Sequence, residues 1–287
     1  MKKDFTFISG LGGSGTRVIV DIFKEINFNF GYDVNRADDD LSFTLLFKLP
    51  THFKKYFGKR SRYINRLLDT HNKLLLNKRL NFLDCYFILR ASILHFFQFR
   101  KYNFKWILYR YKGILFKRRG VDEQLWGWKE PHTIMFIEDI YYKYPKSKFI
   151  LLIRNGLDMV YSKNNQQFYN YSEYFDIDNK NESEKNKFDF WYNFNKYSIE
   201  KGRKLFAENF HIVFYEDLIH HNEGSIKELL QFMGCTADQS SIEKIKLKIT
   251  APQTVNRFKN KDKSWIDKDV KTKLQTIGYD SKKFDLE

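Results

Sequence analysis

The feature that most constrains this chain is a run of glycines between a short apolar segment and an amphipathic one. Residues 5–9 are aromatic and β-branched, a composition typical of a buried strand. Glycines follow at positions 10, 12, 13 and 15, and apolar residues at helical spacing continue to about residue 26. This order of strand, glycine loop and helix puts bare backbone N–H groups at a helix N-terminus, where they bind phosphate or sulfate. The sequence therefore predicts an anion-binding loop.

Two later segments have the composition of strands that are buried on both faces of a parallel sheet. Residues 148–153 and 211–215 are nearly continuously apolar, and a helical pattern follows each. A third candidate strand, residues 125–129, precedes Pro131, and a helix is expected over residues 133–142. Strands that alternate with helices predict an α/β fold with a parallel sheet.

No repeat, low-complexity tract or linker rich in Pro, Gly and Ser divides the 287 residues, so one domain over residues 1–287 is expected. The polar residues 170–187 predict a solvated loop. A long amphipathic helix is expected after it, over about residues 188–208.

The positive charge is concentrated in one block. The formal net charge is +15, and residues 47–119 hold 19 Lys and Arg against only Asp69 and Asp84. The rest of the chain is close to neutral. Because apolar and aromatic residues are interleaved with these charges, the block predicts a basic, aromatic-rich, mainly helical insertion. A solvated basic face is the alternative, and adsorption to anionic lipid is a third explanation.

The composition excludes several classes of protein. Cys85 and Cys235 are too few for a disulfide framework, which favours a reducing compartment and a cytoplasmic location. No stretch reaches the roughly 18 apolar residues of a membrane span, and we expect no signal peptide. The histidines form no ligand spacing with the cysteines, so no metal site is expected.

One interpretation of the glycine loop is a dinucleotide site. Gly10, Gly12 and Gly15 match the pattern G-x-G-x-x-G, and Asp33 stands about where a ribose-binding acid would. This favours an NAD(P)-dependent oxidoreductase. It also requires further strands soon after residue 28, where the basic block intervenes. A turn without a ligand is another alternative, although four glycines in six residues exceed what a turn needs.

The loop also resembles two other phosphate-binding loops. It has the glycine frame of a Walker A loop, but Thr16 and Arg17 stand where that loop has its Lys and its Ser or Thr. Residues 13–17 resemble more directly the phosphosulfate loop of sulfotransferases. Many members of that family carry Lys or Arg at the place of Gly13, and Arg17 or Lys129 could supply the missing charge.

A second motif favours the sulfotransferase interpretation. The strand over residues 148–153 runs into Arg154, and Ser162 follows eight residues later. An arginine at the carboxyl end of a strand binds phosphate through two N–H donors, and a serine two helical turns on adds a hydroxyl. The spacing resembles the motif with which sulfotransferases bind the 3′-phosphate of 3′-phosphoadenosine-5′-phosphosulfate (PAPS). Arg154 alone would more often form a surface ion pair, and Asp158 is expected to cap or support the helix.

Weaker landmarks follow in the order of that family: Lys129 with Pro131, residues 215–218 (Tyr-Glu-Asp-Leu), and Trp265 with residues 274–280. The resemblance implies a P-loop-like, three-layer α/β fold with a central parallel sheet flanked by helices. It also implies a single sulfotransferase-like domain with the basic insertion at about residues 47–119.

The resemblance implies transfer of a sulfuryl group from PAPS to a hydroxyl or amine, with 3′,5′-bisphosphoadenosine as the product and no metal. Arg257 and Lys259 could close over the 3′-phosphate or form a solvated basic tail. The residues expected to bind the donor are Gly12, Gly13, Ser14, Gly15, Thr16, Arg17, Arg154, Ser162, Arg257 and Lys259.

The expected catalytic residues are Lys129 and one acid. Lys129 would stabilise charge on the departing oxygen or protonate it. Asp39 or Asp40 is slightly favoured over Glu130 as the general base. The alternative for the aspartates is that they cap the helix that follows them.

The basic block lies where sulfotransferases build acceptor sites, which implies a saccharide or glycolipid acceptor. We expect no nucleic acid partner. In addition to its donor and acceptor, the protein is expected to contact an anionic membrane peripherally. The inner membrane surface is therefore a second expected location beside the cytoplasm. A non-catalytic protein that binds polyanions or a membrane surface is the remaining alternative, but it leaves Arg154 and Ser162 unexplained.

Overall fold

The computed structural model describes residues 4–98, 104–116, 127–220, 223–236, 238–249 and 251–279. Within these ranges no helix combines the length and the apolar character needed to cross a bilayer. Residues 99–103 and 117–119 of the expected insertion, residues 125–126 of the third candidate strand and residue 280 lie outside them.

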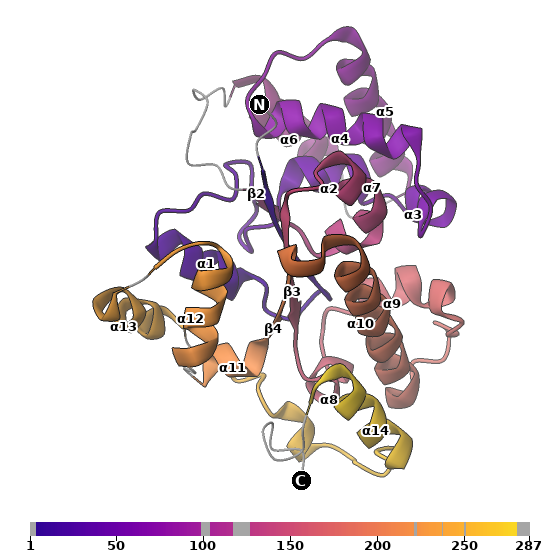
Figure 1. The fold of residues 1–287 in the computed structure, drawn as a ribbon. Coiled ribbons are helices and arrows are strands. Elements are labelled where there is room, and N and C mark those ends of the chain that lie inside the picture. The colour runs from indigo at the N-terminus through magenta and orange to yellow at the C-terminus, as the bar shows by residue number, and fades with distance from the viewer. Residues whose placement is uncertain are drawn as a thin grey trace. The chain divides into compact units, whose positions relative to one another are not determined.

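The fold is α/β, with a four-stranded parallel sheet in the order β2-β1-β3-β4 (Figure 1). Strand β1 (Thr6–Gly10) pairs in parallel with β2 (Gly127–Lys129), and β3 (Lys148–Ile153) pairs in parallel with β4 (Phe210–Phe214). All residues of β1 and β2 are buried, as are all but the first residue of β3. The strands predicted at residues 5–9, 148–153 and 211–215 are therefore confirmed to within one residue.

The chain divides into two compact units, which are described separately. The first unit comprises the start of the chain through Ile8 together with Asn27–Lys148, and the second comprises Ser9–Ile26 together with the chain from Phe149 onward. The single domain over residues 1–287 stays a prediction.

The first unit is mainly helical outside its strands. Asp40 begins α2 by accepting a hydrogen bond from the Phe43 amide, Pro50 opens α3 at its first position, and Ser61 caps α4. The described part of the basic insertion is helical, as predicted. Helix α2 (Leu41–Phe47) precedes the insertion, whose helices are α3 (Pro50–Tyr56), α4 (Arg62–Leu75), α5 (Phe82–Gln98) and α6 (Phe104–Phe116).

The helix expected over residues 133–142 is divided in two. A 3₁₀ helix covers Pro131–Phe136, and α7 covers Ile137–Lys143. Every residue from His132 to Phe136 is buried, so this segment lacks the solvent-facing side of an amphipathic helix.

The second unit contains the helices that follow the glycine loop, β3 and β4. The longest, α10, begins after Ser183, which caps it, and it packs against α8 and α14 (Figure 1). The helices are α1 (Arg17–Glu25), α8 (Gly156–Val160), α9 (Gln166–Tyr171), α10 (Glu184–Phe206), α11 (Tyr215–Ile219), α12 (Glu223–Phe232), α13 (Gln239–Lys248) and α14 (Lys268–Ile277). Short 3₁₀ turns cover Ser172–Phe175, Ala207–Asn209 and Arg257–Asn260.

The solvated loop predicted over residues 170–187 is wrong at both ends. The 3₁₀ turn extends to Phe175, whose ring packs against Phe190 and Phe194, and α10 begins at Glu184. Buried aromatic contacts order the first part of this polar segment, which its average composition does not reveal.

Candidate functional site

The glycine loop lies in the second unit, and two of its glycines have backbone conformations that other residues rarely adopt. Gly13 has φ +92° and Gly15 has φ +96°. A Cβ atom at Gly13 would lie 2.9 Å from the Ser162 hydroxyl oxygen, and one at Gly15 would lie 2.4 Å from the Tyr215 ring. The two motifs identified in the sequence therefore meet. Because a lysine at position 13 would need a left-handed backbone and would crowd Ser162, the cation expected there from the resemblance does not fit.

The start of α1 is open to an anion. Thr16 occupies the N-cap position, but its side chain makes no capping hydrogen bond, and the first turn has no acidic residue. Ser14 is buried, and its hydroxyl has no hydrogen-bond partner among the residues the structure describes. A helix N-terminus combined with an unpaired buried hydroxyl forms a site for phosphate or sulfate oxygens. Arg17 points an exposed guanidinium toward Asp21, with 3.7 Å between Nε and Oδ2.

Gln167 is a site residue that the sequence does not mark. It is buried on α9, and its side-chain oxygen accepts a hydrogen bond from the backbone N–H of Gly12. Its amide nitrogen has no partner within the described ranges. The backbone N–H of Gly12 is therefore already used in a hydrogen bond to a side chain. The side-chain amide of Gln167 is the group beside the loop that could still donate a hydrogen bond to a ligand. Gln167 stands in an Asn- and Gln-rich stretch with no distinctive spacing, so nothing singled it out.

Arg154 follows directly after β3 and is buried. Its Nη2 atom donates to the carbonyl of Thr254 at 2.6 Å and to the Thr254 hydroxyl at 3.1 Å. Its guanidinium carbon lies 4.9 Å from the centroid of the Tyr215 ring. The Nε atom of Arg154 is buried without a hydrogen-bond partner in the described part of the chain, so the side chain retains a donor for a ligand.

Asp158 lies in the first turn of α8, where an acid supports the helix as expected, but it does not cap it. Asn155 caps α8, whereas the Asp158 carboxylate accepts hydrogen bonds from the backbone of Asn256 at 2.9 Å and of Phe258 at 3.4 Å. The Asp158 carbonyl accepts a hydrogen bond from Arg257 Nε at 2.8 Å. Asp158 thus anchors the basic C-terminal segment. Burial and the nearby Arg154 charge lower the pKa of Arg257.

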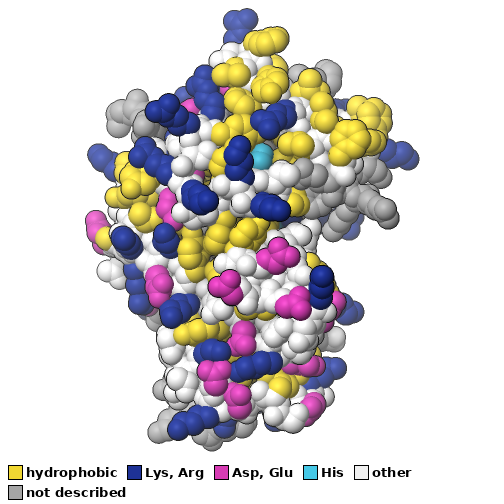
Figure 2. All heavy atoms as spheres, turned by 90° about the vertical axis from the view of Figure 1, so that its right-hand side faces the viewer, with side chains coloured by type: hydrophobic (Ala, Val, Ile, Leu, Met, Phe, Trp, Pro, Cys, Tyr) yellow, Lys and Arg dark blue, Asp and Glu magenta, His cyan; other side chains and the backbone are white. Residues whose placement is uncertain are grey.

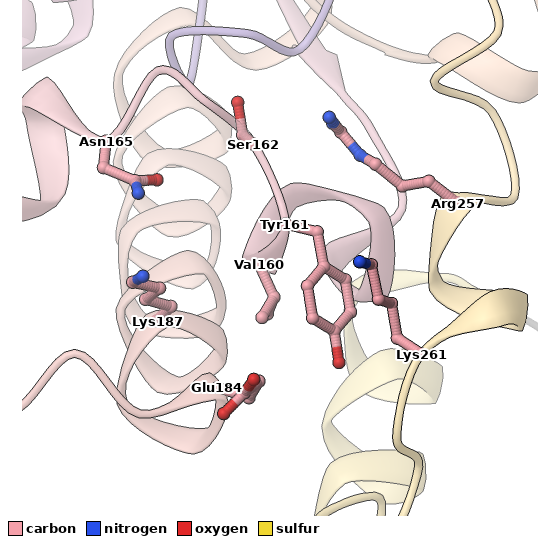
Figure 3. Close-up of a pocket in the computed structure, with 8 residues that line it drawn as sticks. All are labelled: Val160, Tyr161, Ser162, Asn165, Glu184, Lys187, Arg257 and Lys261. Carbon is pink, nitrogen blue, oxygen red and sulfur yellow. The ribbon is translucent and has the colours of Figure 1, made fainter.

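A pocket of about 300 Å³ lies between the end of α8, the start of α10 and this anchored segment. Figure 3 shows the Arg257 guanidinium on the Ser162 side of the pocket and Lys187 on the side of α10. Three cationic side chains and one carboxylate line the pocket, together with Ser162. The lining residues are Val160, Tyr161, Ser162, Asn165, Glu184, Lys187, Arg257 and Lys261. Lys259 is not among them, and the sequence analysis missed Lys187 and Lys261.

In the first unit, Lys129 and Asp39 form a close pair. The Lys129 ammonium lies 2.5 Å from Asp39 Oδ1 and donates to the Ala37 carbonyl at 2.7 Å. The Lys129 side chain is 3% exposed and that of Asp39 is 21% exposed. Within the described ranges, two of the three donors on Lys129 are engaged and one remains.

Asp40 and Glu130 have structural partners. Asp40 caps α2 through the Phe43 amide at 2.6 Å, and it lies 3.2 Å from His71 Nε2. Glu130 accepts a hydrogen bond from the His132 amide at 2.5 Å and lies 2.9 Å from its ring Nδ1. Burial raises the pKa of Glu130, but His132 outweighs this effect and leaves the pKa below its ordinary value. Of the three candidate bases, Asp39 is the one whose carboxylate contacts Lys129 and reaches solvent.

Asp33, the acid that the dinucleotide interpretation requires for the ribose, is already engaged in an ion pair. Asp33 Oδ1 lies 2.5 Å from an Nη atom of the buried Arg110 on α6, which holds the carboxylate in an ion pair. In the described ranges, no group of three His, Cys, Asp or Glu side chains is arranged to hold a metal ion.

Comparisons with known proteins agree with the fold. No curated protein sequence matches the chain. The sulfotransferase domain of the curacin biosynthetic pathway is similar in structure, with 11% identity, a TM-score of 0.50, and coverage of 97% of this chain and 98% of that one. The sulfotransferase domain of the Synechococcus PCC 7002 olefin synthase has 12% identity, a TM-score of 0.50, and coverage of 98% and 97%.

At these identities the structural similarity shows the fold alone. The family itself is shown by sequence, because the model of the sulfotransferase family matches residues 6–239, which include β1, the glycine loop, Lys129, Arg154 and Ser162. The chain therefore belongs to the sulfotransferase family.

Proposed function

We propose that this chain transfers a sulfuryl group from PAPS to a hydroxyl or amine of an acceptor and releases 3′,5′-bisphosphoadenosine. The observation that carries the proposal is the contact between the glycine loop at Gly13 and Ser162, in a unit where Ser14 and Arg154 each keep a buried polar atom without a hydrogen-bond partner among the described residues. The Ser14 hydroxyl and the Arg154 Nε–H group are both hydrogen-bond donors, the kind of group that binds phosphate and sulfate oxygens.

The residues of the second unit fit the donor. Ser14, Thr16 and the amides at the start of α1 would hold the 5′-phosphosulfate, and Arg154 with Ser162 would hold the 3′-phosphate. Arg257 lines the pocket that Ser162 also lines, which supports a role beside the same phosphate. When bound, PAPS supplies an activated sulfuryl group on a phosphate leaving group.

The transfer forms a bond from the acceptor oxygen or nitrogen to sulfur and breaks the bond between sulfur and the phosphate oxygen. Negative charge develops on that oxygen as the bond breaks. We assign its stabilisation to the ammonium group of Lys129, which acts most strongly in the transition state. We assign the role of general base to Asp39, which would accept the proton of the acceptor. Its partly exposed carboxylate contacts the Lys129 ammonium and accepts a hydrogen bond from Asn35 Nδ2 at 2.9 Å.

The first test compares ligands by their effect on thermal unfolding. At about 100 times its dissociation constant a ligand adds about 2.7 kcal/mol, which corresponds to roughly 5 °C or more in a chain of this size. We expect 3′,5′-bisphosphoadenosine to give such a shift at a concentration where ADP, which lacks the 3′-phosphate, gives little. An equal shift with ADP would contradict the assignment of the 3′-phosphate site, and a larger shift with NADH would support the oxidoreductase alternative.

We further propose that the acceptor is a saccharide or glycolipid. The support is the basic insertion, because aromatic faces stack on sugar rings and Lys and Arg bind acidic substituents. If so, a carboxylated saccharide should have a lower KM than its neutral counterpart with the same hydroxyl, and the ratio of the two values should approach one as salt rises. The measurement is transfer of radiolabelled sulfate from PAPS to both saccharides. Because both reactions use PAPS, any effect of salt on donor binding cancels in the ratio of the two KM values. A ratio near one at low salt would contradict an acidic acceptor.

A further inference from the structure

Helix α5 carries an apolar face that stays exposed among the described residues of the first unit. Phe82 is 91% exposed and Phe97 is 78% exposed, and the exposed residues between them include Tyr86, Leu89 and Ile93. Their spacing of three and four residues puts all five on one side of the helix. The opposite side of α5 is buried. Monomeric proteins rarely expose so many large apolar side chains in one place, so this face indicates an interaction surface.

Helix α6 packs against α5 and extends this surface. Phe104, Leu108 and Tyr109 are exposed on α6, and so are Lys105 and Lys112. Figure 2 shows hydrophobic side chains gathered in the upper part of the view, with Lys and Arg side chains among them. The surface formed by these exposed residues of α5 and α6 is called the α5–α6 face below.

The charged residues of the segment that contains the α5–α6 face are mostly cationic. In the described part of residues 47–116 the only acids are Asp69 and Asp84, and both are ion-paired. Asp84 is buried, with its carboxylate bound by Lys73 and by Thr70 at 2.9 Å. Asp69 pairs with Lys143. The face therefore presents apolar groups and cations without an unpaired carboxylate.

A face that combines apolar groups and cations favours an anionic bilayer over a second copy of this chain or a nucleic acid. A second copy of this chain would bring two basic faces together, which like-charge repulsion opposes. Bases of nucleic acid would stack on the aromatic rings but would leave Leu89, Ile93 and Leu108 exposed to water. An anionic bilayer satisfies both features, because apolar side chains enter the interface while lysines reach the head groups.

We propose that the α5–α6 face binds the surface of an anionic lipid bilayer. This property is independent of the catalytic proposal, since it requires none of the residues assigned to the donor or to catalysis. The probes are vesicles of phosphatidylglycerol mixed equally with phosphatidylcholine, and vesicles of phosphatidylcholine alone. Sedimentation of the full chain with each vesicle gives the affinity.

Two double variants test the apolar and the charged parts. Lys105→Gln with Lys112→Gln should weaken binding to anionic vesicles about 30-fold, taking about 1 kcal/mol for each lysine and 1.4 kcal/mol for each tenfold. Phe82→Ser with Phe97→Ser should weaken it at least about tenfold. The matched control is Lys244→Gln with Leu247→Ser on α13, where Leu247 is 82% exposed and Lys244 is exposed. The control should bind like the parent protein.

All substituted residues lie at the surface, so each variant should unfold at the parent temperature and keep its shift with 3′,5′-bisphosphoadenosine. The proposal is overturned if the parent protein does not sediment with anionic vesicles, or if both double variants bind as the control does. A dimer in sedimentation equilibrium that Phe82→Ser with Phe97→Ser dissociates, without vesicle binding, would assign the face to a second copy instead.

Discussion

Replacing Lys129 with alanine is expected to lower kcat for sulfuryl transfer by about 10²–10³-fold, the usual cost of removing one group that stabilises charge in a transition state. Affinity for PAPS should stay nearly unchanged, because its oxygen is still bonded to sulfur and the charge that Lys129 is assigned to stabilise develops only during the transfer. The structure allows this separation. Removal of Lys129 frees Asp39, whose carboxylate is 21% exposed and can be hydrated.

The matched control is Lys143→Ala. Lys143 lies in the same unit, is 17% exposed and also pairs with an aspartate, Asp69, but no catalytic role is assigned to it. Steady-state kinetics and a nucleotide titration on both variants make the comparison. If kcat and nucleotide affinity fall together in Lys129→Ala, Lys129 is a donor-binding residue and the catalytic assignment is wrong.

Replacing Arg154 with alanine is expected to weaken binding of 3′,5′-bisphosphoadenosine by at least about 30-fold, because truncating one partner of a buried charged pair costs about 2–5 kcal/mol. Affinity for ADP should change far less, so the preference for the 3′-phosphate should disappear. Isothermal titration with the two nucleotides measures both effects. Arg154→Lys keeps the charge but loses the planar pair of donors, and we expect it to recover only part of the affinity.

Arg154 also contacts Thr254, so its structural contribution must be measured separately. The unfolding temperature of the ligand-free variant reports that contribution, and Arg203→Ala, an exposed arginine on α10, serves as the control. A preference for 3′,5′-bisphosphoadenosine over ADP that survives in Arg154→Ala would limit Arg154 to anchoring the C-terminal segment.

The sheet and the glycine loop could be predicted from the sequence because both depend on local composition. A strand buried on both faces must be nearly continuously apolar, and this located β3 to the residue. Gly13 and Gly15 stand where φ is positive, so the requirement for glycine is recorded in the sequence itself. The spacing of Arg154 and Ser162 was equally local, since eight residues cover one strand end and the short helix after it.

Contacts between residues that are far apart in the sequence could not be predicted from local composition or spacing. Asp39, Asp40 and Glu130 are equivalent carboxylates in the sequence, and only packing brings Asp39 to Lys129 while α2 and the 3₁₀ helix after Glu130 engage the other two. Asp158 was expected only to cap or support its own helix, but its carboxylate also accepts hydrogen bonds from backbone amides about 100 residues away. The outcome in each case depends on a contact partner that lies outside any local window.

The sequence by itself determined the strands of the sheet, the glycine loop and the excess of positive charge in residues 47–119, because these follow from composition and spacing. The tertiary structure decided which polar groups receive partners. Among the described residues it left one atom each of Ser14 and Arg154 without a partner, whereas Asp40 and Glu130 became caps. It also decided which side of α5 is buried. Apolar residues lie on both sides of that helix, and hydrophobicity is not directional, so only packing could leave Phe82 and Phe97 exposed.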